Sequence, residues 1–129
     1  MEDDKKLEHE LFYADVVVFC ASTIAVDAAL CGKPLIGVAF SAEQSSYWAS
    51  PARFYDYAHL KSIVKSGGIR IVQSSEDLTR EIKEYLENPS RDRGGREKII
   101  SMQGGFADAE SSLRVAKHII HCIRMQTMK

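Results

Sequence analysis

The sequence has no excess of charge of either sign: 17 Lys and Arg residues stand against 18 Asp and Glu residues, for a formal net charge of −1. Proteins that neutralise a nucleic acid backbone or an anionic membrane surface carry a basic excess, so neither partner is expected. A long hydrophobic run is also missing, because the most apolar window, residues 14–31, contains Asp15 and Asp27. We therefore expect no membrane span, and the acidic first residues do not resemble a secretion signal.

Cysteine is scarce, and Cys20, Cys31 and Cys122 form an odd set without CxxC spacing. Their apolar neighbours predict buried, reduced thiols that act as small hydrophobic side chains, as is typical of a cytoplasmic protein. His118, His121 and Cys122 have a helical spacing that can hold a metal, but no fourth ligand lies nearby in the sequence. The sequence therefore predicts no metal, no other cofactor and no catalytic nucleophile.

What is present is an ordinary globular composition, with 45% hydrophobic and 27% charged residues. A chain of 129 residues forms one domain at most. We take residues 1–129 as that domain and expect residues 1–6 and 125–129 to fray.

The first half of the chain contains two strand–helix–strand units. A β-branched run without alternation, residues 14–20, predicts a strand covered on both faces inside a parallel sheet. A helix over 24–31 and a strand over 35–40 follow, and a crossover this short fits a right-handed βαβ unit. The second unit then comprises a long loop, a helix and a third strand, at residues 41–56, 57–65 and 69–72.

The remainder of the chain is expected to be helical. Ser75 is expected to cap a helix over 76–87, and a charged helical segment over 91–103 follows. The last helix is predicted over 108–124. The side chains expected to face inward are Leu78, Ile82, Tyr85 and Leu86 on the first of these helices, and Leu113, Ala116, Ile119, Ile120 and Ile123 on the last.

These elements predict an α/β fold of the three-layer, Rossmann-like kind, with a short parallel sheet of about three strands and flanking helices. Three strands are few for a parallel sheet that must hide both faces and both edges. A helix over 5–13 that leads directly into a strand of the central type is typical of the second half of a larger domain. The alternative is a small protein that completes its sheet by pairing with a second copy.

The end of the first predicted strand is the first candidate site, because ligands of open parallel sheets bind at the carboxyl ends of strands. Ser22 and Thr23 offer hydroxyls and free amides there, which can receive a phosphate or diphosphate. Asp27 follows one helical turn after Thr23, a spacing suited to gripping a ribose diol. The alternative is that both hydroxyls only cap the helix while Asp27 points into solvent.

The loop after the second predicted strand is the second candidate site. Glu43 and Gln44 supply hydrogen-bonding groups for a sugar, and Tyr47 or Trp48 could stack on an apolar ring face. The alternative is a solvated loop with Trp48 in the core.

Arg53 and His59 lie in an aromatic, basic segment just after that loop. Either side chain could offset the charge that develops on a phosphate. The alternative is that the aromatic rings pack and Arg53 pairs with Asp56.

Residues 14–18, the pair Ser22-Thr23 and the segment 27–36, which includes Gly32-Lys33-Pro34, together carry a resemblance to a known family. The pattern resembles the C-terminal, donor-binding half of GT-B fold glycosyltransferases. CDP-glycerol glycerophosphotransferases and UDP-N-acetylglucosamine 2-epimerases share it. The similarity covers about residues 13–87, and it departs from the family where Asp27 stands in place of the commoner Glu.

The resemblance implies specific roles for these residues. It would place Ser22 and Thr23 at the diphosphate of a nucleotide sugar or CDP-glycerol, Asp27 at the ribose, and Glu43 and Gln44 at the sugar or glycerol. In such enzymes the acceptor site and usually the catalytic base belong to an N-terminal domain. The chain is therefore expected to bind the donor without turnover, and to need that domain as a partner.

Two other functions remain open from the sequence. One is a non-catalytic α/β interaction module that forms a homodimer through a sheet edge. The other is part of a UDP-sugar 2-epimerase.

Overall fold

The computed structural model describes residues 2–41, 46–105 and 110–127. In chain order its elements are α1 (Glu2–Tyr13), β1 (Val17–Phe19), α2 (Ile24–Leu30), β2 (Leu35–Val38), the 3-10 helix η1 (Pro51–Asp56), α3 (Ala58–Lys65), β3 (Arg70–Val72), α4 (Ser75–Glu87), α5 (Arg93–Ile99), the π-helical turn η2 (Ile100–Gly104) and α6 (Ser111–Thr127).

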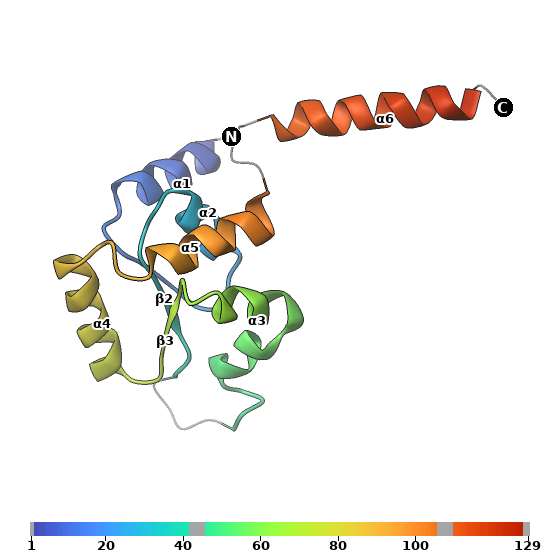
Figure 1. The fold of residues 1–129 in the computed structure, drawn as a ribbon. Helices are drawn as coiled ribbons and strands as arrows, with labels where there is room; N and C mark the ends of the chain where they lie inside the picture. Colours follow the sequence, from blue (N-terminus) through green and yellow to red (C-terminus); the bar gives the residue numbers. More distant parts are fainter. Residues whose placement is uncertain (1, 42–45, 106–109, 128–129) are drawn as a thin grey trace.

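The three strands form one parallel sheet in the order β1–β2–β3 (Figure 1). Val17 pairs with Leu35, and Ile36 pairs with Arg70, so β2 is the central strand. Helix α2 connects β1 to β2, while η1 and α3 connect β2 to β3. The predicted α/β class, with a short parallel sheet flanked by helices, is confirmed, and the arrangement is compatible with a Rossmann-like fold.

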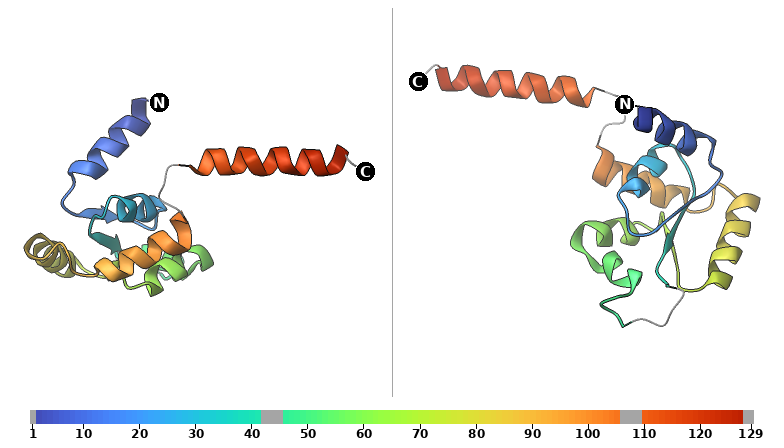
Figure 2. Two further views of the ribbon diagram at one scale, coloured as in Figure 1. Left: turned by 45° about the horizontal axis from the view of Figure 1, so that its top comes forward. Right: turned by 180° about the vertical axis from the view of Figure 1, so that it is seen from behind.

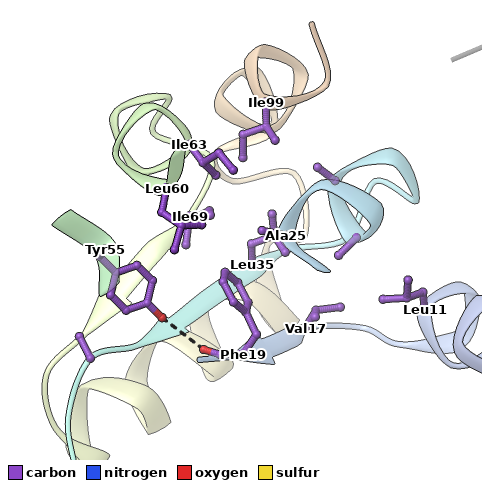
Figure 3. Packing of buried hydrophobic residues seen from close by; sticks show 13 residues of the cluster. Leu11, Val17, Phe19, Ala25, Leu35, Tyr55, Leu60, Ile63, Ile69 and Ile99 are labelled. Atoms are coloured by element: carbon purple, nitrogen blue, oxygen red, sulfur yellow. Dashed lines mark hydrogen bonds between the residues drawn. The ribbon is translucent and has the colours of Figure 1, made fainter. Parts of the chain in front are cut away.

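The larger apolar cluster lies on the sheet face that α2, α3 and α5 cover (Figure 3). Helix α2 contributes Ala25, Ala28 and Ala29, all fully buried. Because these side chains are small, the helix can pack close to the sheet, where the fully buried Leu35 and Ile99 fill the space beside it. Burial of one such Leu or Ile side chain contributes about 1.5–3 kcal/mol.

Helix α4 covers the opposite sheet face, where Ile36, Val72 and Tyr85 form a second buried cluster. The helix starts one residue earlier than predicted, because Ser74 rather than Ser75 caps it: the Ser74 hydroxyl accepts a hydrogen bond of 3.0 Å from the Asp77 amide. The expected inward position of Leu86 is wrong as well. The helix face toward the sheet carries residues 78, 81, 82 and 85, which leaves Leu86 exposed.

Strand β1 lies at an edge of the sheet, which corrects the prediction of a central strand covered on both faces. Val17 and Phe19 are buried on the main core face, whereas Val18 points the other way and remains 42% exposed. The apolar run predicted a strand correctly. It could not show that α4 covers only the other two strands.

The segment after β2 is more ordered than the expected long loop. Residues 51–56 form η1, which begins where the Ser50 hydroxyl accepts a hydrogen bond of 3.2 Å from the Ala52 amide and Pro51 occupies the first helical position. Tyr55 is the buried side chain of this segment, whereas Trp48 is 75% exposed, so the alternative that placed Trp48 in the core is wrong.

The three cysteines, Cys20, Cys31 and Cys122, are free and exposed, so the prediction of buried thiols is wrong. Their positions explain the difference. Cys20 follows an edge strand, Cys31 follows the last turn of α2, and Cys122 belongs to α6.

A contact between glycines joins the end of α3 to α5. Gly67 has a φ of +77°, and a Cβ atom built on Gly68 would lie 2.5 Å from the carbonyl carbon of Gly95. A Cβ atom on Gly95 would in turn overlap the backbone of Gly67 and Gly68. The two backbones can approach this closely only because neither residue has a side chain.

Helix α6 extends away from the rest of the molecule in every view (Figures 1 and 2). Its expected inward-facing residues, Leu113, Ala116, Ile119, Ile120 and Ile123, are all exposed, so that prediction is wrong. The amphipathic pattern predicted the helix correctly but not its packing. Within the described ranges, no helix combines the length and apolar character needed to cross a bilayer.

Candidate functional site

The candidate site begins at the corner where β1 ends and the chain turns into α2. Ala21 has a φ of +43°, in the left-handed region that residues other than glycine rarely adopt. Among the described residues, the Ser22 and Thr23 amides have no hydrogen-bond partner, and the Thr23 hydroxyl caps nothing. The Ser22 hydroxyl accepts a bond of 3.3 Å from the Ile24 amide. The carboxyl end of β1 is therefore followed by two amide donors without a partner among the described residues.

Tyr55 fills the inner part of this corner from η1 (Figure 3). Its hydroxyl accepts a hydrogen bond of 3.0 Å from the Ala21 amide and donates toward the Val38 carbonyl at 3.1 Å, with the Phe19 carbonyl at 3.4 Å. Burial raises the pKa of Tyr55, so the side chain stays a neutral donor. Tyr55 thus ties η1 to the ends of β1 and β2. It is also the partner of the Ala21 amide, so Ala21 differs from Ser22 and Thr23, whose amides have no partner among the described residues.

Asp27 lies one turn along α2 from Thr23, and its side chain is exposed. It borders a shallow groove between α1 and α2, together with Glu8 and Leu11 of α1. The predicted helical spacing from Thr23 is therefore present. The carboxylate also faces the α1 side of the helix, which the sequence did not indicate.

Arg53 is the cation of η1. Its Nε atom is buried and has no hydrogen-bond partner in the part of the chain that the structure describes. The guanidinium carbon lies 4.7 Å from the centre of the Phe54 ring. The alternative in which Arg53 pairs with Asp56 is not seen among the described residues, where Asp56 instead accepts a hydrogen bond of 2.8 Å from the Tyr47 hydroxyl.

Of the other predicted site residues, the structure describes His59 but not Glu43 or Gln44. His59 lies exposed in the first turn of α3, its ring 6.1 Å from that of Tyr57. Glu43 and Gln44 lie outside the described residues. Ser22 and Thr23 lie directly after β1, and Arg53 lies in η1. The sequence did not indicate Tyr55, whose hydroxyl links η1 to the ends of β1 and β2.

A second polar cluster, which the sequence did not indicate, lies between β3, α4 and the turn before α5. Asp92 accepts two hydrogen bonds from Arg70, at 2.7 and 2.6 Å, and one from the Tyr85 hydroxyl at 2.8 Å. Burial opposes ionisation of Asp92, but these hydrogen bonds outweigh it and hold the pKa of Asp92 below its ordinary value. Burial and the bond to Asp92 raise the pKa of Tyr85. We call Arg70, Tyr85 and Asp92 the clamp.

The surroundings of the clamp indicate a structural role. Asp92 has a φ of +60°, and the buried Arg96 donates to the carbonyl oxygens of Arg91 and Pro89, at 2.6 and 2.9 Å. Every polar group at the centre of the cluster therefore has a partner within the protein. Such a saturated arrangement leaves no group to hold a ligand.

The described residues contain no group of three His, Cys, Asp or Glu side chains able to hold a metal ion. On α6, the Cys122 sulfur lies 3.6 Å from the His118 Nε2 atom, and both residues are exposed. Comparisons with family models, curated proteins and solved structures gave no match.

Proposed function

We propose that this chain supplies the diphosphate-binding side of a donor site for a nucleotide sugar or CDP-glycerol, in an enzyme of the glycosyltransferase type. The observation that carries the proposal is the pair of unpartnered amides, Ser22 and Thr23, at the carboxyl end of β1. Ligands of parallel α/β sheets bind at this position. The unusual backbone of Ala21 directly before the pair supports the proposal, since strained residues cluster at functional sites.

The chemistry proposed for the corner is electrostatic. The Ser22 and Thr23 amides and the Thr23 hydroxyl would donate hydrogen bonds to diphosphate oxygens, and the Arg53 guanidinium would offset their charge. Stabilisation of the departing diphosphate needs no proton transfer, so these groups favour bond cleavage without acting as acids or bases. Asp27 would accept hydrogen bonds from the ribose hydroxyls. The acceptor and any catalytic base would come from another domain.

A thermal-shift panel tests the proposal. We expect UDP or CDP to raise the unfolding temperature more than uridine or cytidine, because only the nucleotides carry the diphosphate. Bound ligand stabilises by about 2.7 kcal/mol at a hundredfold excess over its Kd. GDP and ADP complete the panel. Equal shifts with nucleosides, or no shift with any diphosphate, would contradict the proposal.

Two variants separate the corner from general charge effects. Arg53→Gln and Thr23→Val are expected to reduce the shift that UDP or CDP produces. Arg80→Gln is the matched control, because Arg80 is an exposed arginine on α4 that pairs with Asp77 away from the corner. The chain alone, given nucleotide sugars and an acceptor extract, is expected to yield no product, and robust turnover would show that the acceptor side is present.

A self-associating interaction module is the second candidate function. Within the described residues the outer edge of β1 has no strand partner, and Val18 beside it is 42% exposed. Unpaired strand edges are surfaces on which another chain can add a strand. A stable dimer that nucleotides do not affect would favour this function over the donor site.

A further inference from the structure

Two surfaces of this chain expose apolar side chains: one is a protruding helix and the other is a groove. Helix α6 presents large apolar side chains that are 47–59% exposed, including Leu113, Ile119, Ile120 and Ile123. The open groove between α1 and α2 has a volume of about 330 Å³ and an apolar lining of Leu7, Leu11 and Leu30. Of these three, Leu7 and Leu30 remain 40% and 44% exposed. We call the first surface the α6 face and the second the α1–α2 groove.

The charges of the two surfaces are complementary. The sequence of α1 contains five acidic and two basic residues, and Glu8 and Asp27 border the groove. The sequence of α6 contains Arg114, Lys117 and Arg124 and no acidic residue. On a helical projection these basic residues lie together, beside the stripe of apolar positions. An apolar helix with a basic flank therefore matches an apolar groove with an acidic rim.

We propose that the α6 face of one copy docks into the α1–α2 groove of a second copy, and that the exchange is reciprocal. Each copy carries one helix and one groove, so a two-fold arrangement satisfies both pairs and closes the assembly. The partner is a second copy because α6 leads away from its own body in all views, which places it where another molecule can reach it (Figure 2). Exchange of an element between identical chains is a low-cost route to a dimer.

The length of α6 sets how far such a contact can extend. A helix of 17 residues is about 25 Å long, at about 1.5 Å per residue, so its apolar side chains cover about four to five turns. Two such helices contribute to one dimer, which helps the interface to reach the roughly 1,000 Å² that a specific association needs. The opposite charges set the orientation and speed the encounter, so the association weakens as salt rises.

Sedimentation of the whole chain across a wide concentration range is the first test, and a dimer that dissociates on dilution and in high salt is expected. The double substitution Ile119→Glu with Ile123→Glu is expected to raise the dimer dissociation constant more than about tenfold, because each side chain loses its burial in the partner. Both positions are exposed in the single chain, so the fold of the body is not affected. Leu86→Glu is the matched control: Leu86 is equally exposed, on α4, and its substitution leaves the dimer intact.

A charge exchange tests the orientation. Glu8→Lys and Lys117→Glu are each expected to weaken the dimer, and the two substitutions in one chain are expected to restore part of the loss. Restoration is expected only if the two residues meet across the interface. Additive weakening would overturn the proposed pairing of surfaces.

Cross-linking distinguishes a second copy from the chain's own helix. In a Cys20→Ser background, Cys31 borders the groove and Cys122 lies on α6, so a short bis-maleimide can join them. With mixed isotope-labelled and unlabelled chains, we expect Cys31–Cys122 links between the two kinds of chain. Links within one chain only, a monomer at all concentrations, or a dimer unchanged by the α6 substitutions would each overturn the proposal, and the last result would favour pairing at the sheet edge. Nucleotide binding is measured separately in the Ile119→Glu, Ile123→Glu variant, so that a failure of the proposed donor site is distinguished from a failure of the proposed dimer.

Discussion

The clamp and the β1–α2 corner differ in whether their polar groups have hydrogen-bond partners within the described chain. In the clamp, Asp92 accepts three hydrogen bonds from Arg70 and Tyr85, and its neighbours are partnered as well. At the corner, the described residues include two amides without partners, and Arg53 has a buried Nε atom without one. Both regions also contain a non-glycine residue with a positive φ.

The difference teaches how to separate a structural polar cluster from a candidate site. Buried polar groups normally find partners, because an unmet hydrogen bond costs about 1–3 kcal/mol. The clamp meets this requirement internally and holds β3, α4 and the start of α5 together. The corner leaves its amides without a partner among the described residues, at half-buried and exposed positions that water or the proposed ligand can reach. Substitutions in the two regions are therefore expected to act on different quantities.

The largest expected effect belongs to the glycine contact beside the clamp. Gly95→Ala is expected to destabilise the fold by more than about 3 kcal/mol, since the new Cβ atom would overlap the backbone of Gly67 and Gly68. Gly94→Ala is the matched control on the same helix, where a Cβ atom would meet nothing within 4 Å. It is expected to stabilise α5 by about 0.5–1 kcal/mol. Urea unfolding measures both, and equal effects would show that the close contact is not required.

The clamp carboxylate is expected to have the next largest effect. Asp92→Asn tolerates the left-handed backbone but removes the charge, so we expect a loss of about 2–3 kcal/mol near neutral pH. The pKa of Asp92 is lowered in the fold, so its stabilisation is present above the ordinary carboxyl pKa of about 3.9 and is lost as the pH falls through the folded value. Acidification should therefore narrow the gap between wild type and variant.

Asp77→Asn is the control for this pH dependence. Its pKa is also lowered, chiefly by a hydrogen bond from Arg80, but the carboxylate is on the surface of α4, so only a small change is expected. Unfolding midpoints measured from neutral to acidic pH compare the two. A constant gap between wild type and Asp92→Asn would show that the charge of Asp92 does not stabilise the fold.

The Tyr55 hydroxyl, which holds η1 at the β1–α2 corner, is expected to have a smaller effect on stability than Asp92. Tyr55→Phe is expected to lose about 1–2 kcal/mol, because the Ala21 amide and the Val38 carbonyl lose their partner. Tyr47→Phe is the matched control, since the Tyr47 hydroxyl bonds Asp56 at an exposed position, and it should change stability by less than about 0.5 kcal/mol. If the two variants unfold alike, Tyr55 does not hold the corner.

The smallest effect on stability is expected for Asp27→Ala. Its exposed carboxylate makes no contribution to the core, so the unfolding temperature should stay nearly constant. Nucleotide binding is expected to weaken by about 1–3 kcal/mol through the loss of hydrogen bonds to a charged group. Calorimetric titration with UDP and CDP measures this, with Asp15→Ala as an exposed carboxylate control. A large fall in unfolding temperature would assign Asp27 to the fold instead.

Much of the fold could be read from local patterns. The β-branched run near Val17, the alanine-rich helix that ends before Gly32 and the strand after Pro34 were predicted with small errors at their ends. These elements depend mainly on residues close together in the sequence, so the sequence pattern indicates them. The failures have a common origin. The edge position of β1, the exposed cysteines and the detached α6 all depend on what packs against a segment, and periodicity does not contain that information.

The sequence indicated only part of the proposed site. Ser22, Thr23 and Arg53 were proposed because hydroxyl and basic residues after strands are typical of the ligand-binding end of a parallel sheet. Tyr55 was missed because a buried hydroxyl and an ordinary aromatic core residue look alike in a sequence. Asp92 was missed because its partners are 22 and 7 residues away in the chain.

The sequence by itself determined most of the element types and their order, because helix hydrogen bonds and apolar spacing are local, and the short crossovers between the apolar runs favoured a parallel sheet. Only the tertiary structure decided which polar groups are satisfied and which are left open. That outcome depends on distances between side chains far apart in the sequence, such as Tyr55 to Ala21 and Arg70 to Asp92. The residue type determines which donors and acceptors a side chain has. Packing determines whether those donors and acceptors find hydrogen-bond partners within the protein.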